Sequence, residues 1–299
     1  MYCIYSGLDV DGLISPEHII PLSCGGSDKF CIDVSDKYNS KVNHEIDEKI
    51  KNDYFVNIER VLFGYTGHHK NHTRTLLDKN AFFEDGEKIE LILNSGEISV
   101  KFPRYGTTRR IIQLNRYITS TANMVYKVRW RFLAKVALCS GYKLYPANFV
   151  KYVDTSLLRN MIFDNMDTKV RLIDPYCIVN GLKYGGGTFV KTIQNIAKTL
   201  KQTFVLLGFS ADYGMLVFVV IGTHLIGGIS IPANSTEFEH DDIMRWDIVR
   251  CIDKKNAVFE KFGNIACNSA NILLQNALAT ENQNLEWVNV QWQSNGDRH

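Results

Sequence analysis

Hydrophobic positions near the start of the chain follow a strand pattern first and a helical pattern afterwards. Residues 30–34 form a short apolar run typical of a strand, and the Ser-Asp pair at 35–36 can cap a helix. Val42, Ile46 and Ile50 then recur every four residues, so we expect them to face a core. The spacing therefore predicts a strand followed closely by an amphipathic helix.

Two segments in the middle of the chain also show a clear period. The run KIELILNSGEISVKF (88–102) is strand-like on both sides of Asn94-Ser95-Gly96, which predicts a β-hairpin. Residues 122–142 predict a helix that Gly141 is placed to end. Its stripe recurs every four residues and consists of Met124, Val128, Phe132 and Val136.

The rest of the chain is predicted to mix strands and helices. A strand is expected over 203–209, and 215–231 is expected to form two strands joined at a Gly-Thr-His break. A helix is expected over 264–279, followed by a loose tail. The fold class is therefore α+β, with a first region, a β-rich connecting region and a larger α+β region, which we place at 1–75, 76–118 and 119–299.

Composition is that of a globular protein and points to the cytoplasm. Of 299 residues, 45% are hydrophobic and 22% are charged, which is ordinary for such proteins. The start, MYCIYSG, lacks the layout of a signal peptide, and the β-branched run at 215–231 is interpreted as strands rather than a membrane segment. The seven cysteines stand at scattered spacings, as expected for reduced thiols. We expect a cytoplasmic protein without a membrane partner.

Charge is distributed unevenly along the chain. Residues 1–60 hold eleven acidic and six basic side chains, whereas 101–150 hold ten basic and no acidic ones. Aromatic residues interleave with the basic ones in RYGTTRR and YKVRWRF, a composition that favours contact with a phosphate backbone. The alternative is a helix whose polar side is merely basic. The candidates for nucleic-acid contact are Lys41, Arg104, Arg109 and Arg110.

The stretch SPEHIIPLSCGG (15–26) places an acidic residue and a histidine close to a predicted turn. Glu17 is followed by His18, and Gly25-Gly26 marks a turn. In the predicted helix that follows residues 35–36, Asn39 and Asn43 stand four positions apart and share one face. Carboxylate and amide oxygens suit a hard divalent cation, and a neighbouring imidazole can take a proton from water. Because adjacent residues of a strand point to opposite faces, Glu17 and His18 need a turn or bulge to converge on one phosphate.

Residues 13–52 resemble the HNH endonuclease family, the ββα-metal nucleases. The matching pieces are EHIIP, the Gly-Gly pair and the helical Asn39, in the expected order. The resemblance implies an N-terminal ββα-metal motif in which Glu17 and Asn39 hold Mg²⁺, Mn²⁺ or another divalent cation. The resemblance also implies that His18 is the general base. Asn43 stands at a position where some members of the family have a further metal ligand.

Two departures from the family pattern change what is expected of this chain. Members of the family often have an Asn between the Gly-Gly pair and the second strand, where it supports the loop that orients the histidine. This chain lacks that Asn, and the nearest comparable residue after Gly25 and Gly26 is Asp28. Many members hold a structural zinc with two CxxC pairs, but here the corresponding positions, 3–6 and 35–38, keep one thiol of four. We expect no structural zinc. Side-chain packing is expected in its place, from Tyr2, Ile4, Phe30 and Tyr38.

Other polar stretches are interpreted more simply. A metal site at His69 and His72 is possible, but phosphate contacts or a solvated loop are preferred for GHHKNHTR. The Gly-rich run 181–189 lacks the ending of a phosphate-binding loop and is interpreted as a turn. The acidic run 237–242 is interpreted as a solvated loop rather than a second metal site.

The function expected from these features is metal-dependent hydrolysis of DNA, and by resemblance a role in restriction or antiviral defence. One alternative is a nucleic-acid-binding protein with a degenerate nuclease fold. Another is a nuclease effector gated by a ligand or protein partner at the region 150–299. Because one such site cuts one strand at a time, concerted double-strand cutting would indicate a homodimer.

Overall fold

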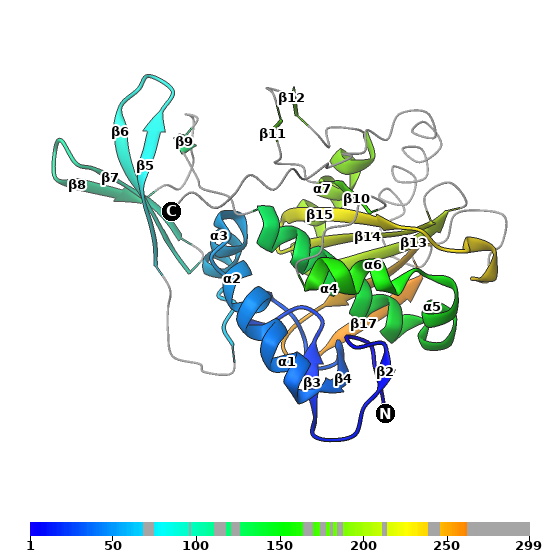
Figure 1. Cartoon of the computed structure of the whole chain (residues 1–299). Helices are drawn as coiled ribbons and strands as arrows, with labels where there is room; N and C mark the ends of the chain where they lie inside the picture. The colour runs from blue at the N-terminus through cyan, green and yellow to red at the C-terminus, as the bar shows by residue number, and fades with distance from the viewer. Residues whose placement is uncertain are drawn as a thin grey trace.

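The structure, a computed structural model, has a mixed α+β fold (Figure 1). It describes residues 1–67, 75–95, 97–110, 118–120, 126–163, 170–173, 178–179, 182–183, 188–210, 214–238 and 246–261. The predictions for His69 and His72, for most of the run 181–189 and for the helix over 264–279 lie outside these residues, as does most of the acidic run 237–242.

A six-stranded antiparallel sheet forms the centre of the molecule. Its strand order is β10-β15-β14-β13-β16-β17, and consecutive neighbours pair antiparallel. The strands are β10 (Arg171–Ile173), β13 (Thr203–Ser210), β14 (Gly214–Ile221), β15 (His224–Ile231), β16 (Trp246–Cys251) and β17 (Ala257–Lys261). The predicted pair of strands over 215–231 is confirmed, with the turn at Gly222-Thr223.

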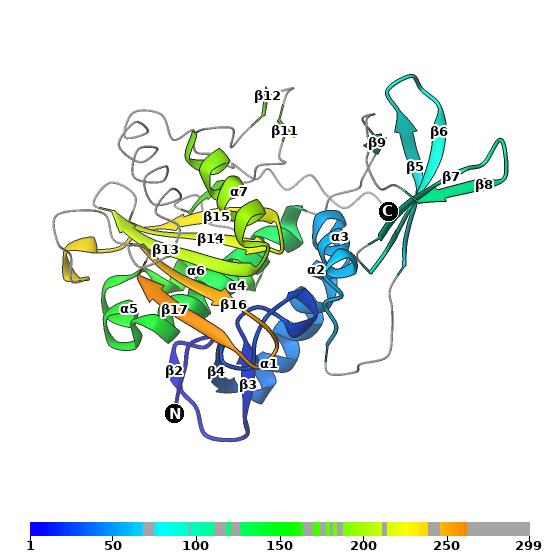
Figure 2. The same cartoon turned by 180° about the vertical axis from the view of Figure 1, so that it is seen from behind.

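Helices cover both faces of this sheet, as the two opposite views show (Figures 1 and 2). One face packs against α4 (Tyr126–Leu144), α5 (Pro146–Tyr152) and α6 (Thr155–Ile162), and the other against α7 (Thr188–Leu200). Alternate residues of β14 therefore enter different clusters, with Val217 on the α4 side and Phe218 on the α7 side. Because helices cover both faces of the sheet, side chains on both sides of its central strands are buried, which explains the continuous apolar sequence of these strands.

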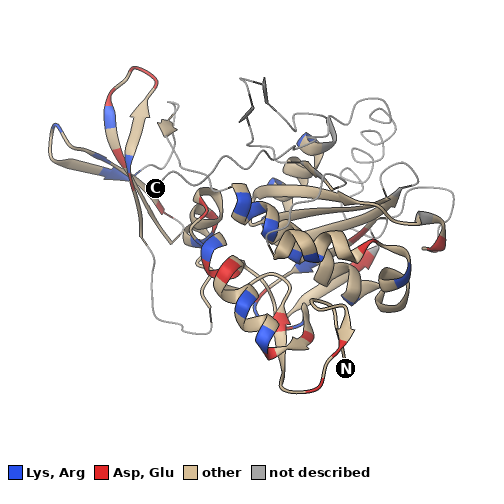
Figure 3. Cartoon of the chain, viewed as in Figure 1, with Lys and Arg blue, Asp and Glu red and all other residues tan. Residues whose placement is uncertain are grey.

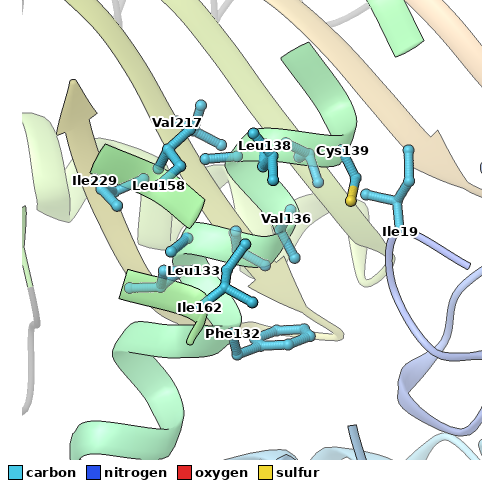
Figure 4. Close-up of a cluster of buried hydrophobic side chains, with 14 of the residues drawn as sticks. Ile19, Phe132, Leu133, Val136, Leu138, Cys139, Leu158, Ile162, Val217 and Ile229 are labelled. Carbon is cyan, nitrogen blue, oxygen red and sulfur yellow. The ribbon is translucent and has the colours of Figure 1, made fainter. Parts of the chain in front are cut away.

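The N-terminal segment shares its core with α4 and the sheet. It contains β1 (Tyr2–Cys3), β2 (Leu8–Asp9), β3 (Ile14–His18), β4 (Cys31–Ser35), α1 (Asp36–Val42), α2 (Glu48–Ile50) and α3 (Tyr54–Leu62). A π-helical turn, Asn43–Asp47, joins α1 to α2. Figure 4 brings together Ile19, which follows β3, with side chains of α4, α6 and the sheet. The predicted strand at 30–34 and the buried stripe Val42, Ile46 and Ile50 are confirmed.

The connecting region forms a separate five-stranded sheet that projects from the body as an arm (Figure 1). Its strand order is β8-β7-β6-β5-β9, and the hairpin predicted around Asn94 is confirmed by pairing of that residue with Glu97. The strands are β5 (Leu76–Phe83), β6 (Lys88–Asn94), β7 (Glu97–Phe102), β8 (Thr107–Arg110) and β9 (Ile118–Ser120). Two shorter strands elsewhere, β11 (Ile178–Val179) and β12 (Leu182–Lys183), pair with each other.

Helix α4 differs from its prediction in two ways. It runs past Gly141 to Leu144, so this glycine does not end the helix. Its role is to allow close packing. A Cβ at Gly141 would stand 2.1 Å from the Phe149 ring of α5. The helix is also buried around its whole circumference from Arg129 to Gly141, so Arg129, Arg131 and Lys135 lie inside the protein, whereas Lys127 and Lys143 near its ends are exposed.

None of the helices in the described part of the chain combines the length and the apolar character needed to cross a membrane.

Candidate functional site

The end of strand β3 carries the two residues with the strongest chemical signal. Glu17 pairs opposite Ile32 and His18 opposite Cys31 in a regular antiparallel register, so the expected bulge is absent from this hairpin. Alternation therefore sends the two side chains to opposite sides of β3. Glu17 is 2% exposed and faces the interior, whereas the His18 side chain is 21% exposed.

On the interior side, Glu17 meets a fully buried ammonium group. Lys135 of α4 forms ion pairs with Glu17 and with Asp47 from the π-helical turn. Its Nζ donates hydrogen bonds to Asp47 Oδ1 at 2.9 Å, to Asp47 Oδ2 at 2.8 Å and to the His18 carbonyl at 2.8 Å. With Glu17 Oε1, the ammonium has four oxygen neighbours for its three N–H groups. Glu17 Oε1 is buried and is the oxygen of Glu17 that pairs with the ammonium.

Burial and charge determine the protonation of this cluster. Burial raises the pKa of Asp47 to about 7, although the charge of Lys135 lowers it. Desolvation acts to lower the pKa of Lys135, but the two carboxylates outweigh it and keep that pKa above its usual value. Tyr5 and Cys139, which interact with the cluster, are neutral because burial raises the pKa of both.

On the other side of β3, His18 contacts a carboxylate. Its Nε2 lies 2.9 Å from Asp28 Oδ1, so the residue predicted to support the loop contacts the histidine directly. The intervening loop needs both of its glycines. Gly25 has a φ of 81°, and a Cβ at Gly26 would stand 1.8 Å from the Ile20 carbonyl oxygen.

The two asparagines of the first helix take different positions. Asn39 is half-buried, and its Nδ2 donates to Ser15 Oγ at 2.8 Å and to the Pro16 carbonyl at 3.1 Å. Ser15 and Glu17 lie on one side of β3, so Asn39 approaches the strand on the Glu17 side. Asn43 is exposed at the start of the π-helical turn, and no contact between it and Glu17 is recorded in the described structure.

The C-terminal part of the sheet also contacts the histidine loop. The turn between β16 and β17 presents the Lys254 carbonyl, which accepts a 2.7 Å hydrogen bond from the Asp28 backbone N–H. The same carbonyl accepts from Ser27 Oγ at 3.4 Å. Phe30, at the end of the loop, packs edge-to-face on Phe259 of β17. Sequence analysis did not anticipate these contacts, because they join residues more than two hundred positions apart.

The basic residues of α4 do not form the nucleic-acid surface that YKVRWRF was interpreted to indicate. Arg129 and Asp53 form a buried ion pair with 2.7 Å between Nη2 and Oδ2. Arg131 reaches Glu45 at 2.6 Å, and Lys135 reaches Asp47. Acidic residues of the N-terminal segment thus pair with basic residues of α4, which lies beside the N-terminal helices (Figure 3). The uneven distribution of charge was the signal for this pairing.

The residues named for nucleic-acid contact are exposed. Lys41 lies over the Phe163 ring, and Arg104 and Arg109 lie over the rings of Tyr105 and Phe102 in the β7–β8 hairpin. Arg110 pairs with Glu97 at 2.9 Å. Residues 76–110 contain six basic and six acidic side chains, so the formal charge of this part of the arm is 6 − 6 = 0. The arm is therefore not a strongly basic surface.

The residues at β3 fit a divalent cation in one respect. Among the described residues, no group of three His, Cys, Asp or Glu side chains is placed to hold a metal ion. Glu17 is a buried carboxylate and Asn39 approaches the same side of β3, but Glu17 Oε1 is ion-paired with Lys135 and Asn39 turns its Nδ2 toward the strand. Oxygen donors of these two types suit Mg²⁺ or Mn²⁺.

Residues in and beside the segments 3–6 and 35–38 pack against other side chains. Arg159 lies against Gly7 in the turn between β1 and β2. The rings of Tyr5 and Tyr38 both contact Phe163. Tyr2 contacts Tyr142, and Ile4 is buried in the main core.

Comparison of the chain with family models, with curated proteins and with solved structures finds no match.

Proposed function

We propose that the protein is a metal-dependent endonuclease of the HNH type that hydrolyses phosphodiester bonds in DNA. Support comes from the order of elements, in which the antiparallel pair β3 and β4 is followed directly by α1. Asn39 of α1 bonds to β3 next to Glu17 and provides the helix-to-strand contact that such a site requires.

One observation carries the proposal. Two neighbouring residues of β3 combine a histidine that contacts a carboxylate with a buried carboxylate on the side that Asn39 approaches. A carboxylate orients an imidazole and raises its basicity, which is what a general base needs. Glu17 is ion-paired with Lys135, so a divalent cation at this carboxylate would have to take the place of the ammonium.

The chemistry follows from these two groups. Proton transfer from the attacking water is assigned to the imidazole of His18, which Asp28 contacts at Nε2. The water oxygen forms a bond to phosphorus, the bond to the leaving oxygen breaks, and that oxygen takes a proton from solvent. A divalent cation held by Glu17 and Asn39 would stabilise the negative charge that develops on the phosphate. Because the two side chains leave β3 on opposite sides, the phosphodiester must lie across the end of the strand at His18.

The test is cleavage of supercoiled plasmid by wild type and by His18→Ala, with Mg²⁺, Mn²⁺ or EDTA. We expect nicking by wild type that EDTA abolishes, and a loss of at least about 100-fold in His18→Ala, the usual size of a general-base contribution. His44→Ala is the matched control, because His44 is exposed on the neighbouring helix. Cleavage by His18→Ala at the wild-type rate would remove His18 from the mechanism.

The gated alternative is favoured by the contact of the β16–β17 turn with the histidine loop. Movement of this turn would be transmitted to Asp28 through its 2.7 Å backbone hydrogen bond. In the same assay, this alternative predicts no cleavage by the purified chain with any metal, and cleavage after a ligand or partner of the C-terminal region is added. A nucleic-acid-binding protein with a catalytically inactive nuclease fold would instead shift the plasmid on a gel without cutting it.

A further inference from the structure

Charge is unevenly distributed within the arm, although the acidic and basic residues of its described part balance. The turn between β5 and β6 carries Glu84, Asp85 and Glu87, whereas residues 99–110 carry four basic and no acidic side chains. Figure 3 shows the acidic and the basic residues at different tips of the arm. The β7–β8 hairpin is therefore a local basic surface on an arm that is neutral as a whole.

Two of the four basic side chains are neutralised within the arm. Lys101 pairs with Glu90 and Arg110 pairs with Glu97, each at 2.9 Å. The pairing register places Lys101 and Arg110 on the same side of the sheet, because their partners across the hairpin are Thr108 and Ser99. This side of the hairpin has balanced charge.

The other two basic side chains, Arg104 and Arg109, form no ion pair with a carboxylate in the described part of the chain. Their guanidinium carbons lie 5.7 and 5.9 Å from the ring centroids of Tyr105 and Phe102. A ring below a guanidinium orients its plane and leaves the N–H donors at its edge for other acceptors. The hairpin therefore holds two oriented cations whose charge the protein does not neutralise.

The hairpin also presents backbone donors. In the described sheet, β8 is an edge strand that pairs only with β7, and all four of its residues are exposed. Alternate N–H groups of an antiparallel edge strand point away from the sheet. Phosphate oxygens accept hydrogen bonds from both arginine and backbone N–H groups, so this edge suits a chain of phosphates.

The hairpin stands well away from the body of the protein. At the other end of β7, the β6–β7 turn lies close to α3, because a Cβ on Gly64 would stand 3.4 Å from Ser95 Oγ. The six residues of β7 span about 20 Å at 3.4 Å each. Helix α3 also contacts the histidine loop, since Arg60 Nε donates to the Ser23 carbonyl at 2.6 Å. One helix therefore connects the arm with the loop that carries Asp28.

We infer that the β7–β8 hairpin binds the phosphate backbone of DNA through Arg104 and Arg109. This inference rests on the proposed function and names a surface by which such a nuclease would hold its substrate. A reach of about 20 Å corresponds to about six phosphates along one strand. The contact is to the backbone, so it adds affinity without sequence preference.

Arg104→Ala/Arg109→Ala tests the inference by fluorescence anisotropy with a labelled duplex of about 24 base pairs, which is about 80 Å long. EDTA is present, so binding is measured without metal-dependent cleavage. Each phosphate contact contributes about 0.9 to the slope of log affinity against log salt, and about eightfold to affinity at about 0.1 M salt. We expect the slope to fall by about two and the affinity to fall about 60-fold.

Lys79→Ala/Lys88→Ala is the matched control. Both lysines are exposed on the two strands that the acidic turn joins, and this variant removes the same charge from the same arm. Long-range attraction of DNA changes equally in both variants, so a difference between them measures contact. We expect the control to bind within about threefold of wild type, because screening weakens charges that make no contact.

Arg104→Lys/Arg109→Lys guards against a loss of structure in the alanine variant. Lysine keeps the charge for a phosphate contact, so the salt slope is expected to remain that of wild type. A slope reduced as far as in the alanine variant would contradict a role of these charges in binding phosphate.

The outcomes distinguish this inference from the function on which it rests. If Arg104→Ala/Arg109→Ala binds DNA as tightly as Lys79→Ala/Lys88→Ala while wild type nicks plasmid, the hairpin is not the contact and the nuclease stands. Unchanged affinity together with self-association of the arginine variant would show that the arginines protect the edge of β8, which also overturns the inference. If wild type neither binds the duplex nor nicks plasmid, the nuclease and the inference both fail.

Discussion

At the scale of single residues, Asp47 links the stability of the protein to pH. Its pKa in the folded state is raised to about 7 by burial, whereas a carboxyl group of this type in an unfolded chain titrates near about 4. Between these values the folded protein holds a proton that the unfolded chain has lost. Stability from this group is therefore complete below about pH 4 and is lost as pH rises through about 7.

This linkage predicts how wild type and Asp47→Asn differ. The amide does not titrate, so the free energy of unfolding of wild type should fall relative to that of the variant as pH rises from 4 to 7. Urea denaturation at one-unit intervals of pH measures the difference. Two profiles that run parallel across this window would show that Asp47 has an ordinary pKa in the folded protein.

Individual residues of the site differed in how well the sequence predicted them. Glu17, His18 and Asn39 were named from their order in the chain, and the structure places Asn39 against β3 on the Glu17 side. Lys135 was not singled out, because a lysine in a basic helix gives no sign that it is buried until its partners are known. Asp28 was named for the loop, but its contact with the His18 ring depends on the path of twelve residues between the strands.

At the scale of elements, α4 is a structural helix whose basic residues neutralise the N-terminal segment. We expect Arg129→Met to lower the free energy of unfolding by about 3–5 kcal/mol, because it leaves Asp53 buried without its counter-ion. Asp53 also caps α3 by accepting from Phe55 N and Val56 N, which keeps its charge in place. Denaturant unfolding of the purified variant gives the value.

Arg109→Ala is the matched comparison for Arg129→Met, because Arg109 is exposed on β8. A surface change of this kind is expected to alter stability by less than about 0.5 kcal/mol. If Arg129→Met were as stable as Arg109→Ala but lost affinity for DNA, α4 would regain the nucleic-acid role that its sequence first indicated.

Periodicity was sufficient for elements that obey a simple pattern. The β6–β7 hairpin, the β14–β15 pair and the helix after β4 were predicted because each has a clear period or turn. The boundary of α4 was wrong because Gly141 was judged as a helix terminator, when its role is to admit the Phe149 ring. Local sequence does not show which neighbour a glycine accommodates.

At the scale of the whole molecule, the first 75 residues depend on the rest of the chain. The largest core contains residues from Cys3 to Cys251, and three acidic side chains of the N-terminal helices pair with α4. We predict that a fragment of residues 1–75 is unfolded in isolation, because it would expose this apolar surface and leave Glu17 and Asp47 without Lys135. Circular dichroism and the dispersion of amide resonances would test this, with the full chain as reference.

A fragment of residues 1–75 that unfolds cooperatively would instead establish the first region as an independent domain. The division of the chain into three regions was drawn from motifs and turns, which report local structure. It had no means of detecting a core shared between residues that are far apart in sequence.

The pairing of α4 with the N-terminal helices also sets an order of events during synthesis. The two partners of these buried pairs stand 76, 86 and 88 positions apart. At about 5–20 residues per second, roughly 4–18 seconds pass between translation of Asp47 and translation of Lys135. During that interval the emerging chain carries its acidic residues in water, and the surface that α4 will cover is open to chaperones. The end of β3 therefore acquires its final contacts only after α4 has been translated.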